Sequence, residues 1–260
     1  MSDPRTVEPA GTLWLEAPNW AELDRLTQRQ KPWVLWHIGF QTVLAHWMDE
    51  AVRRNMARVE IIAPDRPTEL ERELGDGVYW SRDVRVHPTV PEDAPAERES
   101  MALLPGQTGP DQPYDEKTML SYWLDVQLAW LSAREESISV DRQLHPRVWV
   151  GPGVQIHPAA KICGPCWIGS RAQIGADATV GPNAIVGVRS VVDGQASVEN
   201  AVVQSDTFVG AHLHLDHMIA DGATLFDLKR HTRVELTDRF MLSRLRTSFW
   251  SWLTGSRRQS

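Results

Sequence analysis

Residues 144–219 read LHPRVWVGPGVQIHPAAKICGPCWIGSRAQIGADATVGPNAIVGVRSVVDGQASVENAVVQSDTFVGAHLHLDHMI. Every sixth residue in the first part of this stretch is aliphatic: Leu144, Val150, Ile156, Ile162, Ile168, Ile174, Val180, Val186, Val192 and Val198. The residue four places after each of these is usually small: Val148, Val154, Ala160, Cys166, Ala172, Ala178, Ala184, Ser190, Ala196 and Val202. Two columns in phase predict a coil with three flat faces, in which the aliphatic residue fills the interior and the small residue lets the chain turn.

The repeat continues in the last part of this stretch after a shift of one residue. The aliphatic column resumes at Val203, Val209 and Leu215. Glycine follows the aliphatic position in five hexads, where a turn benefits from a missing Cβ: Gly151, Gly169, Gly175, Gly181 and Gly187. We therefore expect an all-β domain over residues 141–236.

These hexads resemble the left-handed parallel β-helix of bacterial acyltransferases and of sugar-nucleotide pyrophosphorylases. The left hand is implied by that resemblance, and it departs from the usual right-handed crossover. Hexapeptide repeats specify a fold and leave the chemistry undetermined.

The N-terminal part, residues 1–87, has the pattern of an α/β domain. Residues 43–55 carry an apolar stripe at helical spacing, and residues 59–63 form an apolar run that predicts a strand. A second helix is expected over residues 67–74, ended by Gly75, with a further strand over residues 84–86.

This order of elements resembles the opening of the nucleotidyltransferases that make sugar nucleotides. The matching motifs are Lys31-Pro32, Gly75-Asp76-Gly77 and Trp80. The family's glycine-rich phosphate loop should precede Lys31, where the chain reads NWAELDRLTQRQ without glycine. The strand-end Asp that holds Mg²⁺ in the family has no counterpart, and the sugar-binding part of the domain is missing. The resemblance therefore implies a truncated nucleotidyltransferase-like domain.

Three further segments complete the expected organisation. Residues 88–114 are rich in proline and charge and predict a linker. Residues 115–140 predict a connecting helix, expected to pack across the mouth of the coil. Residues 237–260 predict an amphipathic helix, with Met241, Leu245, Phe249 and Trp252 along one face. That helix either caps the coil or docks to a membrane or a partner.

Composition excludes several classes of function. The net charge is −7 and the isoelectric point is near 5.7, which argues against a nucleic-acid partner because phosphate binding needs clustered cations. The chain starts without a leader pattern and holds no long apolar run, so we expect a cytoplasmic protein. Two cysteines do not make a disulfide framework.

Two short motifs have both a structural and a chemical interpretation. Cys163-Gly164-Pro165-Cys166 matches a thioredoxin-type redox motif, but Cys166 occupies the small-residue column, which favours a packed structural thiol. His212, His214, Asp216 and His217 match the HxHxDH zinc signature of metallo-β-lactamase-like hydrolases. Their place in the last turns of the coil favours solvent-facing histidines, and we expect no metal.

Hexapeptide acyltransferases use a histidine near a groove between coils as the general base. The candidates of this type are His157, His212, His214 and His217. Nothing in the sequence separates them from solvent-facing histidines of a coil.

The leading hypothesis is a degenerate, non-catalytic relative of sugar-nucleotide pyrophosphorylases, acting as an accessory or regulatory component of bacterial surface-polysaccharide and nucleotide-sugar metabolism. Two alternatives remain open: a hexapeptide-repeat acyltransferase acting on a nucleotide sugar, and a residual nucleotidyltransferase. We expect no cofactor, and self-association or a partner protein bound through the β-helix. A nucleotide sugar is the expected ligand.

Overall fold

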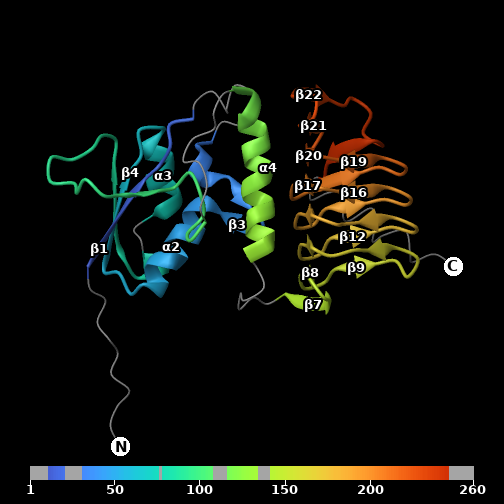
Figure 1. Cartoon of the computed structure of the whole chain (residues 1–260), viewed down its shortest axis with the longest axis horizontal. Helices are drawn as coiled ribbons and strands as arrows, with labels where there is room; N and C mark the ends of the chain where they lie inside the picture. The colour runs from blue at the N-terminus through green and yellow to red at the C-terminus, as the bar shows by residue number, and fades with distance from the viewer. Residues whose placement is uncertain (1–10, 21–30, 76–77, 108–115, 134–140, 246–260) are drawn as a thin grey trace, which may run out of the picture. The chain divides into compact units, whose positions relative to one another are not determined.

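The computed structural model describes residues 11–20, 31–75, 78–107, 116–133 and 141–245. The chain divides into two compact units, Met1–Glu116 and Lys117–Ser260 (Figure 1). Within the described residues, no helix is long and apolar enough to cross a membrane.

The first unit is built on a parallel sheet with the strand order β5-β4-β1-β6. Its strands are β1 (Thr12–Glu16), β4 (Arg58–Ile62), β5 (Asp83–His87) and β6 (Glu99–Ser100). On β1 alternate residues are buried, Leu13 and Leu15, whereas β4 is buried continuously over residues 59–62. The predictions of β4 and β5 are confirmed, whereas the sequence analysis missed β1.

Two predicted helices of the first unit are also confirmed. Helix α2 (Val43–Arg53) begins after Thr42, whose hydroxyl accepts a hydrogen bond from the amide of Ala45 at 3.1 Å. Helix α3 (Pro67–Leu74) has proline at its first turn and ends at Gly75, whose φ of 61° suits glycine. Short elements flank them: η1 (Trp33–Leu35), β2 (His37–Ile38) and β3 (Gln41–Thr42) precede α2, and η2 (Val78–Trp80) follows α3.

The expected linker over residues 88–114 is corrected for residues 99–104. Strand β6 pairs with β1, and Met101 and Ala102 behind it are fully buried. The indole of Trp33 donates to the carbonyl of Met101 at 3.2 Å, and that of Trp47 donates to the carbonyl of Leu103 at 2.9 Å. A strand of two residues leaves no alternating pattern in the sequence, which explains the wrong prediction.

The second unit contains the predicted parallel β-helix, with three parallel ladders. The strands in chain order are β8 (Val148–Val150), β9 (Gln155–Ile156), β10 (Lys161–Ile162), β11 (Cys166–Ile168), β12 (Gln173–Ile174), β13 (Thr179–Val180), β14 (Ala184–Val186), β15 (Val191–Val192), β16 (Ser197–Glu199), β17 (Ala201–Val203), β18 (Thr207–Val209), β19 (His214–Asp216) and β20 (Met218–Asp221). We name the faces by their strands: sheet C runs β8-β11-β14-β17-β20, sheet D runs β9-β12-β15-β18, and sheet E runs β10-β13-β16-β19.

The interior of the coil follows the two predicted columns. Val150, Ile168 and Val186 stack in register on sheet C, and all three are buried. The phase shift is accommodated where Val186 pairs with Val203, 17 positions later instead of 18. A Cβ on Gly187 would lie 2.4 Å from the backbone nitrogen of Ser205 in the next turn, so close approach of neighbouring turns requires glycine there.

Antiparallel strands close both ends of the β-helix. At its start β7 (Arg142–His145) folds back on β8, so Leu144 precedes the regular turns. At its end β21 (Thr224–Asp227) and β22 (Thr232–Glu235) extend sheet C.

The predicted C-terminal helix is wrong over the described residues 237–245, none of which is helical. Strand β23 (Leu242–Arg244) forms there instead, antiparallel to β18 on sheet D. Leu242 is fully buried in the interior of the β-helix, whereas Phe240 is 86% exposed. Pairing with an open strand edge outweighs the helical spacing of the apolar residues. Residues 246–260, including Phe249 and Trp252, lie outside the described residues.

Helix α4 (Glu116–Ser132) lies along the outer face of sheet C and not across the mouth of the coil (Figure 1). Trp123 contacts Phe226 of β21 edge to face, with ring centroids 5.8 Å apart. Trp130 contacts Trp167 of β11 in the same way. The helix therefore spans several turns of the β-helix, because an apolar ladder runs along this face.

Candidate functional site

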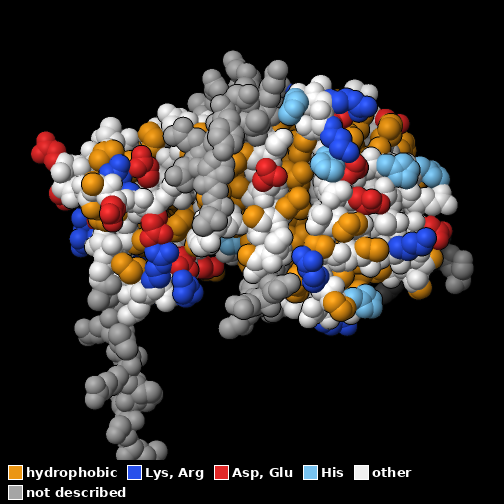
Figure 2. Space-filling view, in the orientation of Figure 1, with side chains coloured by type: hydrophobic (Ala, Val, Ile, Leu, Met, Phe, Trp, Pro, Cys, Tyr) orange, Lys and Arg blue, Asp and Glu red, His pale blue; other side chains and the backbone are white. Residues whose placement is uncertain are grey.

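Acidic, basic and histidine side chains are interspersed on the visible surface of the β-helix (Figure 2). On this face, among the described residues, no large patch of a single sign of charge is seen. On the β-helix, polar side chains gather in a pocket on sheet D and in a network at the end of sheet E.

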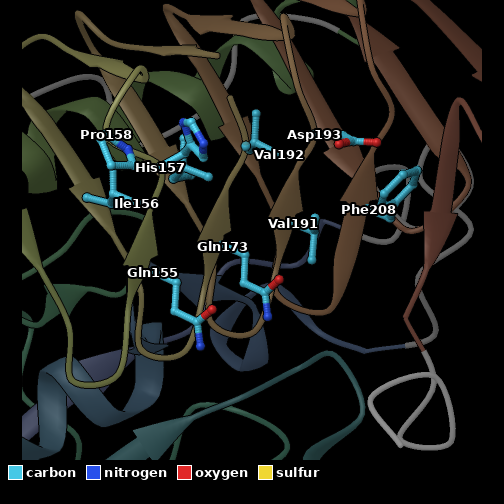
Figure 3. Close-up of a pocket in the computed structure, with 11 residues that line it drawn as sticks. Gln155, Ile156, His157, Pro158, Gln173, Val191, Val192, Asp193 and Phe208 are labelled. Atoms are coloured by element: carbon cyan, nitrogen blue, oxygen red, sulfur yellow. The ribbon is translucent and has the colours of Figure 1, made fainter. Parts of the chain in front are cut away.

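The pocket lies on the outer face of sheet D and has a volume of about 500 Å³. Outward side chains of four strands in register form its floor: Gln155, Gln173, Val191 and Phe208. His157 and Asp193 lie at its rim (Figure 3). Of the four candidate histidines, His157 is the one that lines this pocket.

The hydrogen bond made by His157 argues against its use as a base. Its Nδ1 accepts a hydrogen bond from the amide of Ala159 at 3.1 Å. A backbone amide can only donate, so the neutral imidazole carries its proton on Nε2. The lone pair that a general base needs is therefore already engaged, and His157 serves as a turn-stabilising residue and a donor.

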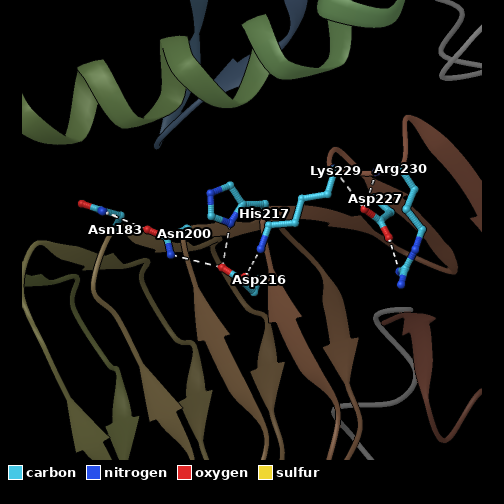
Figure 4. Close-up of polar contacts among 7 residues, drawn as sticks. All are labelled: Asn183, Asn200, Asp216, His217, Asp227, Lys229 and Arg230. Atoms are coloured by element: carbon cyan, nitrogen blue, oxygen red, sulfur yellow. Dashed lines mark hydrogen bonds and ion pairs between the residues drawn. The ribbon is translucent and has the colours of Figure 1, made fainter.

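His217 has the opposite arrangement. Its Nδ1 lies 2.7 Å from Oδ1 of Asp216 (Figure 4). An ionised carboxylate only accepts hydrogen bonds, so Nδ1 carries the proton and Nε2 of the neutral ring keeps its lone pair. Nε2 makes no hydrogen bond to any residue that the structure describes, and the side chain is 45% exposed. This is the tautomer of an oriented general base.

A polar ladder fixes the carboxylate of Asp216. Asn183 donates to the side-chain oxygen of Asn200 at 3.0 Å, and Asn200 donates to Oδ1 of Asp216 at 3.1 Å. The ammonium of Lys229 pairs with the other carboxylate oxygen. Both carboxylate oxygens of Asp216 are therefore fixed by their partners, and the contact with Oδ1 in turn orients the imidazole of His217 (Figure 4).

The backbone explains why this ladder forms. Asn183, Asn200 and His217 occupy the same corner in successive turns, before the strands β14, β17 and β20. Their φ values of 52°, 46° and 55° lie in the left-handed region, where asparagine is tolerated better than most residues. The corner thus stacks polar side chains one turn apart.

Lys229 reaches Asp216 from the loop between β21 and β22. Oδ1 of Asp227 accepts hydrogen bonds at 3.0 Å from the amides of Lys229 and Arg230, which closes the loop as an Asx-type turn. The guanidinium of Arg230 donates to the other oxygen of Asp227 at 2.8 Å. The ammonium is therefore presented by a structured loop.

Electrostatics keep Asp216 ionised. Hydrogen bonds from Lys229 and Asn200, together with the neighbouring His217, hold the pKa of Asp216 well below its usual range. A carboxylate that remains charged can stabilise a protonated imidazole beside it.

The remaining histidines do not join this arrangement. His214 Nδ1 lies 2.8 Å from the hydroxyl of Ser197, a group that rotates and either donates or accepts, so neither tautomer is selected. His212 is exposed at a left-handed corner. Within the described residues, no three His, Cys, Asp or Glu side chains are grouped to hold a metal ion, so the HxHxDH residues do not converge.

The structure of the Cys163-Cys166 motif fits a packed structural thiol at Cys166 and not a redox motif. Cys166 is fully buried in the interior of the β-helix, and Cys163 is exposed. Burial, with a smaller contribution from Cys163, raises the pKa of Cys166 to about 12. A reactive thiol needs a lowered pKa, so the interpretation as a structural thiol is confirmed.

In the first unit, the residues after β1 stand where the nucleotidyltransferase resemblance requires a phosphate loop. Trp20 is buried there and packs on Trp33, with ring centroids 4.9 Å apart. A phosphate loop needs exposed backbone amides that approach the ligand closely. Residues 21–30, which include most of the glycine-free stretch before Lys31, lie outside the described residues.

Sequence reasoning named His217 and Asp216 but missed the residues that hold them. The spacing of 17 between Asn183 and Asn200, and again between Asn200 and His217, is one turn of the coil after the phase shift. That signal was present in the sequence. Lys229 approaches Asp216 from the hairpin of β21 and β22. This hairpin is not part of the sequence repeat, so no periodic pattern predicts the contact.

No protein-family model matches the chain, and no curated protein matches it in sequence. Among solved structures, it is similar to the acetyltransferase domain of PglB from Neisseria gonorrhoeae FA1090, a structure in complex with acetyl coenzyme A. The sequence identity is 14% and the TM-score is 0.19, over 64% of this chain and 96% of that chain. The parallel ladders of the chain itself identify its second unit as a parallel β-helix.

Proposed function

We propose that the second unit transfers an acyl group from a thioester to a hydroxyl or amino acceptor, with His217 as the general base. The observation that carries this proposal is the pair formed by His217 and Asp216, in which a fixed carboxylate leaves Nε2 available for proton transfer. The resemblance of the repeat to acyltransferase coils supplies the reaction class.

In this reaction Nε2 of His217 takes the proton of the acceptor as its oxygen or nitrogen attacks the thioester carbonyl. The tetrahedral intermediate then expels the thiolate, which receives the same proton from Nε2. Asp216 stabilises the imidazolium between these two steps. Asn200 and Lys229 act as positioning residues, because they contact Asp216 and not the imidazole.

The test is an assay of the full chain with acetyl-CoA and a panel of amino and hydroxyl acceptors, including amino sugars and nucleotide sugars. Coenzyme A should be quantified by chromatography, because the exposed Cys163 would react with thiol reagents. We expect His217→Asn to lower kcat by about 100-fold or more, the usual contribution of a general base. His212→Asn serves as the control and should retain activity, because His212 is exposed and belongs to neither site. Full activity of His217→Asn would contradict the proposal.

We also propose that the first unit does not transfer nucleotides and has an accessory role. Trp20, buried against Trp33, is the specific observation in favour. The full chain should therefore form no sugar nucleotide from a nucleoside triphosphate, a sugar 1-phosphate and Mg²⁺. Turnover that is abolished by a single substitution in the first unit would overturn this part.

A further inference from the structure

The three outer faces of the β-helix differ in chemistry. Sheet C presents an apolar ladder, and sheet E presents polar side chains in register: Lys161, Thr179, Ser197 and His214. Sheet D combines both kinds, with two glutamines followed by Val191 and Phe208. Both apolar side chains are partly exposed. Ligand sites usually combine apolar or aromatic side chains with a few polar groups, and the outer face of sheet D offers both kinds.

Three consecutive turns contribute to the rim of this pocket. His157, Gly175 and Asp193 directly follow the inward aliphatic residue of β9, β12 and β15, so they lie side by side at one edge of sheet D. A Cβ on Gly175 would lie 2.7 Å from the backbone nitrogen of Gly194, so the next turn packs directly against this glycine, and the rim side chains are the imidazole and the carboxylate (Figure 3). These two side chains are separated by two strand spacings, or about 10 Å.

The polar groups of the pocket have hydrogen-bonding capacity left over. His157 uses Nδ1 for the amide of Ala159, so Nε2–H remains a donor. Asp193 accepts from the amide of Gly194 with Oδ1, so Oδ2 remains an acceptor. The amides of Gln155 and Gln173 make no hydrogen bond to any described residue, and each offers both donors and an acceptor.

Charge restricts the ligand. No lysine or arginine is among the described residues that line the pocket, and Asp193 contributes a negative charge. Phosphorylated ligands are therefore disfavoured, since phosphate sites need cations or converging backbone amides. A neutral ligand with many hydroxyl groups suits the two amides, the carboxylate and the imidazole donor.

Phe208 completes the site. An aromatic face carries partial negative charge and attracts the weakly positive C–H groups of a saturated ring. Planar hydrogen-bonding side chains beside an aromatic ring suit a pyranose, which has hydroxyl groups at its edge and C–H groups on its faces. We propose that the outer face of sheet D is a binding site for a neutral carbohydrate, with a sugar ring against Phe208 and its hydroxyl groups on Gln173 and Asp193.

This site is separate from His217, which lies at the corner between sheets E and C, and it does not depend on the proposed acyl transfer. The volume of about 500 Å³ falls within the usual range for small-molecule pockets. The two proposals therefore stand or fall independently.

The experiment is saturation-transfer NMR on the full chain, with chitotriose and cellotriose as neutral probes and trigalacturonate as the anionic probe. We expect saturation transfer to at least one neutral probe, and none to trigalacturonate. Gln173→Ala should weaken binding of the neutral probe by about fivefold, through the loss of a hydrogen bond. Phe208→Ala should weaken it by about tenfold, through the loss of an aromatic face.

Thr179→Val is the matched control, because Thr179 occupies the equivalent outward position on sheet E of the same turn. Its affinity for the neutral probe should equal that of the unmodified chain. Since Phe208→Ala could disturb folding, circular dichroism accompanies each variant, and Gln173→Ala tests the site without removing apolar contacts. Absence of transfer to both neutral probes, equal transfer to trigalacturonate, or equal weakening by Thr179→Val would overturn the proposal.

Discussion

The indole of Trp130 on α4 meets that of Trp167 on β11 edge to face, with ring centroids 5.5 Å apart and ring planes at 90°. Trp167 belongs to a ladder of outward apolar residues on sheet C, one from each strand: Trp149, Trp167, Ile185, Val202 and Ile219. All five are buried. Burial of the apolar surface of this ladder therefore holds the helix on the β-helix.

Replacing Trp167 by alanine should therefore destabilise the second unit. The side chain is 1% exposed, and its Nε1 donates to Asp141 at 2.9 Å. We expect a loss of about 3–5 kcal/mol in the free energy of unfolding, the usual cost of removing a buried aromatic side chain. Urea unfolding followed by circular dichroism measures it, with Thr179→Val, at a partly exposed outward position of sheet E, as the control. A loss no larger than that of the control would show that α4 does not depend on this contact.

The coil could be predicted because its information is local and repeated. Each turn places an aliphatic residue such as Val180 inside and a small residue such as Ala178 at the corner, so the period reports the fold directly. The ladder under α4 is equally periodic: the residue before the aliphatic column is apolar on sheet C and polar on sheet E. That signal favours a helix packed on the flat face of sheet C, where α4 lies, and not across the mouth of the coil.

The elements that were missed or wrong have no such period. Strand β6 has two residues, and its place beside β1 depends on a pairing more than 80 positions apart in sequence. Strand β23 competes with a helical pattern and forms because β18 offers an open edge. At the site, His217 was named by residue type alone. Its tautomer and the reach of Lys229 depend on distances that only the folded chain defines.

Acid should destabilise the chain through Asp216. Its pKa is lowered in the folded state, so the unfolded chain binds more protons below the ordinary aspartate pKa of about 3.9. The stabilisation is present above that pKa and is lost as the pH falls through the lower pKa of the folded state. Urea midpoints between pH 6 and pH 2.5 should fall more for the unmodified chain than for Asp216→Asn. Equal losses would mean that the Lys229 contact does not stabilise the fold in solution.

The two cysteines should differ sharply in reactivity. Cys163 is exposed, whereas Cys166 is buried and its pKa is raised to about 12, so its thiolate is scarce near pH 8. Iodoacetamide should add one group to the folded chain, at Cys163, and two groups after unfolding in urea. Mass spectrometry of peptides locates them. Cys166→Ala is the matched control, which should take up one group in either state, and rapid labelling of Cys166 in the folded chain would contradict its burial.

Strand β23 should determine the stability of the closing end of the β-helix. Leu242 is fully buried, so Leu242→Ala should cost about 2–5 kcal/mol in the free energy of unfolding. Phe240, two residues earlier and 86% exposed, is the matched control, and Phe240→Ala should change stability by about 0.5 kcal/mol or less. A helix with Met241, Leu242 and Leu245 on its buried face predicts a different pattern, because Met241→Ala would then cost about as much as Leu242→Ala. Met241 is 42% exposed in the strand, so we expect Met241→Ala to cost clearly less than Leu242→Ala, and chemical denaturation of these three variants decides between strand and helix.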